Sequence, residues 1–317
     1  DLGMGMMFPF IAKTEEDKKT VYRAMGPFWD ANEVWLVAAG GVTFAAFPFA
    51  YAAMFSSLYS PLMVILFALI MRAVSIEFRG LTESVRWKSF FDYLLAVSSV
   101  VPAFLFGLLF ANIFRGIPIG KGGVFLGTMS SLFDPYGMAG GFLFVLLFLL
   151  HGALWLAIKS DGELRNRAVS AGKDTWPVVV VTALIFLVLS IFTTGLYTNY
   201  LLRPVLFLVP FIAVVSLLLL WFSLRRGAFW KAWFSSGIAI LFITLFGVVG
   251  LHPNLIPSSI DAAYSLTIYN AASSPGTLKI MLVVVAIFVP MVIVYQAWMY
   301  WLFRDRITEE DLSHNTY

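Results

Sequence analysis

The chain has 317 residues, of which 60% are hydrophobic and 12% are charged, and its formal net charge is +3. A soluble globular chain is typically about 45–50% apolar and about 25% charged, so this composition excludes an ordinary water-soluble fold and indicates a surface wetted by lipid. The absence of cysteine excludes disulfides, thiolate metal sites and a cysteine nucleophile. The small net charge does not indicate a surface that binds nucleic acid.

The first apolar stretch is too short to cross a membrane. Asp1–Ile11 is apolar apart from Asp1, and at about 1.5 Å per residue it covers half of a hydrocarbon core roughly 30 Å thick. Because the chain does not begin with Met, we expect these residues to be the end of a first helix whose N-terminal part is missing.

Later apolar stretches have the length of membrane-spanning helices, which need about 20 residues. They are Val34–Phe55, Leu58–Ile76, Tyr93–Phe114, Met138–Ile158, Pro177–Leu196, Val205–Ser223, Trp230–Leu251 and Ile280–Phe303. Lipid-exposed backbone must satisfy its own hydrogen bonds, so each is expected to be helical. The sequence therefore predicts an all-α, polytopic membrane protein with nine transmembrane helices, the first truncated, in a single transmembrane domain over residues 1–317.

The loops carry an uneven share of basic residues. Of 21 Lys and Arg, 17 fall on one side, in residues 12–33, 72–92, 159–176, 224–231 and 304–306. The other four are Arg115, Lys121, Arg203 and Lys279. The positive-inside rule places the richer side in the cytoplasm, so we expect a cytoplasmic C-terminus and an N-terminus outside.

Two loops on the poorer side are long, residues 115–137 and residues 251–278. Loops beyond about 12–15 residues are uncommon without a function, so we expect these to cover a site or to contact a partner.

Asp1 is expected deep in the membrane, about 15 Å from the face that the helix reaches near Ile11. A carboxylate there costs about 2.5–3.5 kcal/mol and usually faces a cavity, a partner or a proton path. The alternative is that Asp1 is a mobile end with no function.

Asp30 and Glu33 lie at the cytoplasmic entrance of the next helix, beside Trp29, Asn32 and Trp35. Two carboxylates crowded there can hold a proton and pass it to water or to Asp1. The alternative is a capping box, with Asp30 as the N-cap and Glu33 three residues later.

Arg72, Glu77 and Arg79 follow at the end of the third helix. We favour snorkelling of this helix end, with Glu77 neutralised between the two guanidinium groups. The alternative is that this group holds the Asp30 region in place.

His151 is mid-helix and is expected to be a hydrogen-bonded packing residue, with haem ligation as the alternative. The small residues Ala38-Ala39-Gly40-Gly41 indicate a helix that packs tightly, either within the bundle or against a partner. The sequence contains no Walker A loop, no G-x-S-x-G motif and no His–Cys metal spacing, so nothing indicates a metal site or a self-contained catalytic centre.

The sequence resembles subunit II of the cytochrome bd quinol oxidases. The similarity is carried by Asp1-Leu2-Gly3-Met4-Gly5, by Gly26-Pro27-Phe28-Trp29-Asp30-Ala31-Asn32-Glu33-Val34-Trp35-Leu36 and its continuation to Ala53, by Arg72 with Phe78-Arg79, by Pro257-Ser258-Ser259 through Ser274, and by Arg306-Ile307-Thr308-Glu309-Glu310-Asp311. Residues 115–250 match only in pattern.

The resemblance implies two four-helix bundles plus one peripheral helix, paired with a homologous subunit I that carries haems b and d. The complex would oxidise quinol and reduce dioxygen to water, in the cytoplasmic membrane of a prokaryote. This chain would bind no redox cofactor and have no catalytic residue, with room for a structural quinone or lipid and for a small single-helix accessory subunit.

Proton uptake would run through Asp30, Asp1 and Glu33, supported by Trp29, Asn32, Arg72 and Glu77. Glu33 departs from the Gln often found at its position in the family, and its added charge would hold a second proton or alter Asp30. Two other interpretations stay open: a proton-coupled secondary transporter, and a scaffold whose acids serve only caps and packing.

Overall fold

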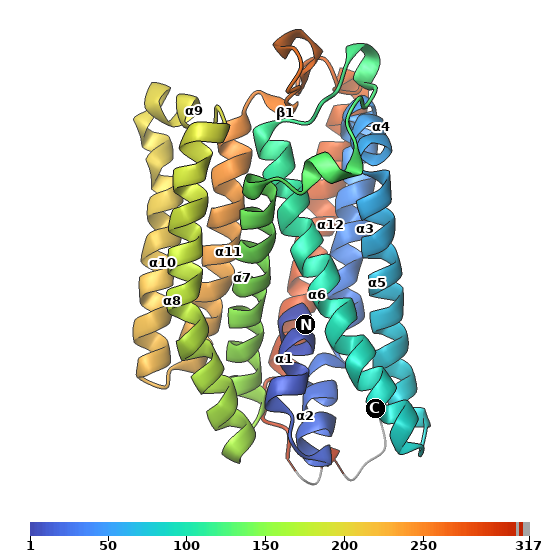
Figure 1. Cartoon of the computed structure of the whole chain (residues 1–317), viewed down its shortest axis with the longest axis vertical. Coiled ribbons are helices and arrows are strands. Elements are labelled where there is room, and N and C mark those ends of the chain that lie inside the picture. The colour runs from blue at the N-terminus through green and yellow to red at the C-terminus, as the bar shows by residue number, and fades with distance from the viewer. Residues whose placement is uncertain (309–310, 313–317) are drawn as a thin grey trace.

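The computed structural model describes residues 1–308 and 311–312, so Glu309 and Glu310 of the tail motif lie outside the described residues. Most of the described chain is helical (Figure 1). The α-helices are α1 Leu2–Ile11, α2 Glu15–Met25, α3 Trp29–Ala46, α4 Pro48–Ser57, α5 Tyr59–Phe78, α6 Val85–Arg115, α7 Pro135–Lys159, α8 Gly162–Thr193, α9 Tyr197–Leu202, α10 Leu208–Arg225, α11 Phe229–Leu251 and α12 Pro275–Leu302.

Seven helices in the described part of the chain are long and apolar enough to cross a membrane: α5, α6, α7, α8, α10, α11 and α12. This confirms an all-α, multi-pass membrane protein. These observations do not test the count of nine spans or the division into two four-helix bundles, so both stay predictions.

The expected helix Val34–Phe55 is interrupted, and that prediction was wrong. Phe47 leaves helical geometry between α3 and α4, and Pro48 occupies the first turn of α4. Proline has no N–H to donate to the preceding turn, and its ring clashes with the carbonyl four residues earlier, so it begins a new helix here.

The first described residue lies inside the bundle (Figure 1). Asp1 lies well above the lower end of the bundle, α1 descends from it, and α2 lies at that lower end before α3 begins. We call this end, which holds the turns between α1 and α2, α5 and α6, α7 and α8, and α10 and α11, the basic end.

Helix α1 packs into the angle between α6 and α7. A Cβ atom added to Gly3 would lie 1.8 Å from the carbonyl oxygen of Phe148, and one added to Gly152 would lie 2.6 Å from the Gly3 carbonyl carbon. The two backbones therefore touch, as small residues permit in helix packing within membranes.

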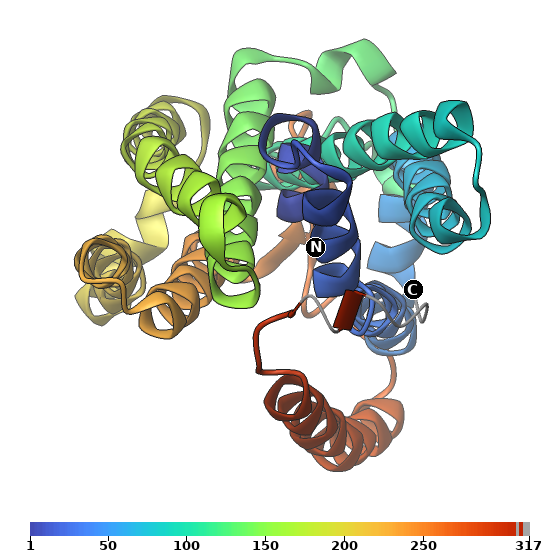
Figure 2. The ribbon, with the colours of Figure 1, turned by 90° about the horizontal axis from the view of Figure 1, so that it is seen from below.

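Helix α12 stands apart from the others, as the view from below shows (Figure 2). None of its residues is buried, and it packs chiefly against α3. Helix α12 therefore lies at the edge of the described bundle.

The two long loops join at the end opposite the basic end (Figure 1). Ile117 N donates to Pro257 O at 3.1 Å, and Ser259 N donates to Ile117 O at 3.0 Å. The second loop also forms a short antiparallel pair, β1 Asn254–Ile256 with β2 Leu266–Thr267. Their buried side chains pack on Ala50 and Ala53 of α4, so the loops cover the region just beyond the α3–α4 interruption.

Candidate functional site

Asp1 and Asn32 meet inside the bundle. The Asn32 side-chain amide donates to the Asp1 carboxylate, which joins the start of α1 to the first turns of α3. Asp1 is half-buried and is bound by this contact. The beginning of α3 therefore lies at the depth of Asp1 and not at the surface of the basic end.

Glu33 and Arg72 form an ion pair one residue further along α3. Arg72 Nη1 donates to Glu33 Oε1 at 2.5 Å. Arg72 is 1% exposed, while 23% of the Glu33 side chain is exposed. Within the described residues, the Nε and Nη2 atoms of Arg72 have no hydrogen-bond acceptor. Buried donors of a charged group are costly to leave unpaired, so this guanidinium is suited to holding water.

Two sequence predictions about this group were wrong. The N-cap of α3 is Phe28 with no side-chain cap, so Asp30 and Glu33 do not form a capping box. Glu77 is exposed, and no ion pair in the described chain joins it to either arginine. A guanidinium buried among apolar helices pairs with a carboxylate that is also withdrawn from water, whereas Glu77 stays solvated.

Asp30 points away from this group. It is exposed, as are Val34, Val37 and Gly41 on the same face of α3. A Cβ atom added to Gly40 or Gly41 would meet nothing within 4 Å. The small residues of α3 therefore do not pack inside this chain, and they leave an open helix face with a carboxylate near one end.

Gln296 of α12 fixes the start of α3, a role that the sequence analysis missed. Its Oε1 accepts from Trp35 Nε1 at 2.9 Å, and its Nε2 donates to Ala31 O at 3.1 Å. A lone amide inside an otherwise apolar span was the available signal.

A second charge cluster, which is partly buried, lies closer to the basic end. Arg79 Nε donates to Asp92 Oδ1 at 2.5 Å, and its Nη2 reaches Glu15 Oε2 at 3.0 Å. Lys18 Nζ bridges the same two carboxylates at 3.0 and 3.1 Å. Tyr22 donates to Asp92 at 3.3 Å. The cluster holds α2 against α5 and α6, so Arg79 anchors the fold and does not snorkel.

The electrostatics of α2 follow from these contacts. Burial raises the pKa of Glu15, but hydrogen bonds from Lys18 and Arg79 outweigh it, so the net pKa lies below its usual 4.5. Burial lowers the pKa of Lys18, and its two carboxylate partners more than offset that, so the net pKa is raised. Both groups stay charged across the physiological range.

His151 makes the contacts expected of a packing residue. Its Nδ1 lies 2.6 Å from Ser236 Oγ, and its ring stacks on Trp233 at 5.1 Å between centroids. Throughout the part of the chain that the structure describes, no three His, Cys, Asp or Glu side chains are grouped to hold a metal.

An apolar pocket of about 190 Å³ opens among α7, α8, α10 and α11, lined by residues that include Trp176, Leu187, Leu217 and Phe246. Such a lining suits an acyl or isoprenoid chain and no charged ligand.

Comparison with known sequences decides the identity. The sequence model of the family described as cytochrome bd terminal oxidase subunit II matches residues 1–303. The chain belongs to this family. It is therefore a subunit of a quinol oxidase, which implies a complex with subunit I, and the secondary-transporter interpretation is set aside.

Curated relatives and one solved structure agree. The chain is 32% identical to cytochrome bd ubiquinol oxidase subunit 2 of Bacillus subtilis, covering 98% of this chain and 91% of that protein. It is 29% identical to the cytochrome bd-I ubiquinol oxidase subunit 2 of Escherichia coli, covering 100% and 92%. Its fold is similar to a chain of the bd oxidase from Geobacillus thermodenitrificans, with a TM-score of 0.73 at 15% identity over 95% and 93% of the two chains.

Proposed function

We propose that this bd oxidase subunit II carries protons from the cytoplasm to a subunit I that holds haems b and d. Subunit I performs the quinol oxidation and the four-electron reduction of dioxygen to water. In this proposal the subunit sits in the cytoplasmic membrane of a prokaryote, with its basic end in the cytoplasm, where Lys and Arg are retained.

The open face of α3 is the surface that we assign to subunit I. A carboxylate facing lipid costs about 2.5–3.5 kcal/mol, so an exposed Asp30 on a membrane helix calls for a protein partner. Gly40 and Gly41 have free space beside them, which lets a partner helix approach closely. Asp30 then lies at the boundary between the two subunits.

The single observation that carries the proton path is the clustering of three acids around the first turns of α3. Asp1 is held by Asn32, and Glu33 by Arg72, while Asp30 faces outward from the same turns. Proton carriers need groups that gain and lose a proton at short intervals, linked directly or by water.

Glu33 and Arg72 have a structural part in this scheme. Arg72 and Glu33 form an ion pair that holds the first turns of α3 against α5. We assign proton exchange to Asp1 and Asp30. Trp29 and Asn32 position them.

Turnover of the purified complex tests the proposal. Asp30→Asn removes the exchangeable proton with almost no change in volume, and we expect quinol-driven oxygen consumption to fall at least tenfold with the haem absorption spectrum unchanged. Asp30→Glu should restore most of it. Asp174→Asn, at an exposed carboxylate on α8, is the matched control and should have no effect.

Unchanged turnover in Asp30→Asn would support the scaffold interpretation instead. Loss of haem absorption together with turnover would assign Asp30 to assembly and not to proton uptake.

A further inference from the structure

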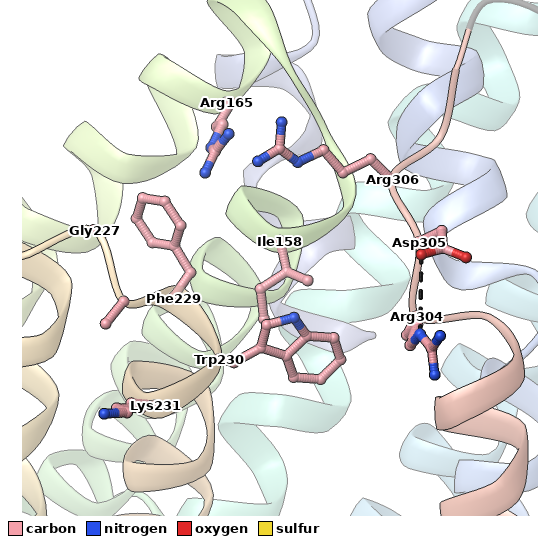
Figure 3. A pocket seen from close by; sticks show the side chains of 10 residues that line it. Ile158, Arg165, Gly227, Phe229, Trp230, Lys231, Arg304, Asp305 and Arg306 are labelled. Atoms are coloured by element: carbon pink, nitrogen blue, oxygen red, sulfur yellow. Dashed lines mark ion pairs between the residues drawn. The ribbon is translucent and has the colours of Figure 1, made fainter.

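A cationic pocket of about 470 Å³ opens at the basic end, away from the acids of α3 (Figure 3). Four of its lining residues are basic, namely Arg165, Lys231, Arg304 and Arg306, and one is acidic, Asp305. Nothing in the proposed proton path uses this pocket.

The charges around the pocket leave an excess of cations. Asp161 pairs with Arg306 at 3.1 Å and with Arg165 at 3.6 Å, and Asp305 lies 4.0 Å from Arg304. Four basic side chains and one acidic side chain line the pocket, and Asp161 beside it adds a second acid, so cations are in excess. This excess favours an anionic ligand.

The start of α11 adds to this attraction. Phe229, Trp230 and Lys231 form its first turn and line the pocket. No side chain caps this end, and first-turn N–H groups have no acceptor within their own helix. A helix N-terminus favours a phosphate group.

One wall of the pocket is held firmly in place. Lys159, the last residue of α7, donates from Nζ to Phe303 O and, at 2.6 Å, to Asp305 O. Ile307 N donates back to Lys159 O at 2.9 Å. These hydrogen bonds hold the segment after α12 against the end of α7. The backbone of Arg304 and Arg306 is therefore held in place at the pocket.

The remaining lining is apolar, and this decides the class of ligand. Ile158, Phe229 and Trp230 also line the pocket, near Arg165 and Arg306 (Figure 3). Nearby, Arg304 stacks over Trp301 at 4.8 Å, and Trp301 is 59% exposed. Indoles gather at the headgroup level of a bilayer. A free phosphate ion would contact only the basic side chains, whereas a phospholipid would contact both the basic and the apolar side chains of the pocket.

We propose that this pocket binds the phosphodiester headgroup of an anionic membrane phospholipid. Arg165, Lys231 and Arg306 contact the phosphate, and Trp230 lies against the glycerol and the first acyl carbons. Basic pockets between transmembrane helices on the cytoplasmic side recognise such headgroups.

Lipid binding to the delipidated, purified complex tests this assignment. Native mass spectrometry would measure retention of phosphatidylglycerol by the wild type and by the Lys231→Gln/Arg306→Gln variant. Each basic residue near the surface contributes about 1 kcal/mol, so the double variant should bind about thirty-fold more weakly. Arg86→Gln/Lys173→Gln, which removes two basic residues at the same end but outside the pocket, should bind as the wild type does.

The lipid probes separate the possible occupants. Wild-type complex should bind phosphatidylcholine at least tenfold more weakly than phosphatidylglycerol, and millimolar inorganic phosphate should not displace the bound lipid. Equal binding of the two lipids, or displacement by inorganic phosphate, would overturn the assignment.

The salt dependence of lipid binding tests the proposal on the wild-type complex alone, in case the double variant does not assemble. Raising the salt concentration from about 0.05 M to about 0.5 M screens exposed charges. It should weaken phosphatidylglycerol binding to the wild type several-fold and leave phosphatidylcholine binding unchanged. Salt-independent binding would contradict the proposal.

Discussion

Arg72 on α5 and Glu33 on α3 form a charge-compensated pair, with Nη1 donating to Oε1 at 2.5 Å and the guanidinium 1% exposed. The pair joins α3, which carries Asp30, to α5.

Removing only one member of this pair should destabilise the subunit. Arg72→Met leaves Glu33 without its cation, and breaking a buried pair costs about 3 kcal/mol or more. We expect a loss of that size in the free energy of unfolding, measured by denaturant titration in mixed micelles. The Arg72→Met/Glu33→Gln double variant should recover most of it, because no unpaired charge remains. A double variant as unstable as Arg72→Met would show that the two residues are not coupled.

The contact between α1 and α7 should not tolerate a methyl group. Gly3→Ala places a Cβ 1.8 Å from Phe148 O, so the helices must separate. We expect a lower yield of assembled complex and a melting temperature lower by several degrees. Gly195→Ala is the control within the same subunit, since its new Cβ meets nothing within 4 Å and it lies outside the α3 face assigned to subunit I. Equal melting temperatures for the two variants would contradict the close packing.

Lowering the pH should weaken the packing of α2 against α5 and α6, because Glu15 becomes protonated. Its pKa is lower in the folded protein than its usual 4.5, so the ionised form contributes stability above about pH 4.5. That contribution is lost as the pH falls from there through the folded-state pKa. Thermal unfolding measured against pH should show a loss in this range for the wild type. The Glu15→Gln variant should lose less stability over the same range, and parallel curves for the two proteins would refute this role.

His151 should be dispensable for the haem spectrum. His151→Phe keeps a ring to stack on Trp233 and removes only the contact with Ser236. The visible absorption of the purified complex should match the wild type, with a modest loss of stability. Loss of one haem band would reassign His151 as a ligand.

The sequence predicted the helix limits well where the hydrophobic span alone determines them. A long apolar run without charge has one stable form in lipid, so the spans that became α7 and α11 were placed within a few residues of their limits. The ends were less accurate where a helix continues into water. Helix α8 begins at Gly162, 15 residues before the expected Pro177, because amphipathic turns extend it beyond the apolar run.

The early start of α6 explains the unforeseen charge cluster. Its first residue is Val85 and not Tyr93, so Asp92 lies two turns inside the helix and is 7% exposed. Read as a loop residue, Asp92 could not be recognised as the partner of Arg79. Burial of this kind depends on how helices dock, which local sequence does not specify.

The acids of α3 show the same limit. The sequence identified Asp1, Asp30 and Glu33 as one group, but it could not assign partners to them. Asn32 contacts Asp1, Arg72 contacts Glu33, and Asp30 faces outward. Which side of a helix faces a neighbour follows from tertiary packing, which the local sequence does not specify.

The most direct test of the account is the uptake of protons during turnover in sealed vesicles that contain the complex in one orientation. A pH indicator confined to the compartment that faces the basic end would follow uptake after quinol and oxygen are supplied. Positioned proton carriers typically accelerate transfer about 10²–10⁴-fold, so Asp30→Asn should slow uptake from that compartment at least tenfold. Uptake at the wild-type rate in Asp30→Asn, or uptake from the opposite compartment, would contradict the account.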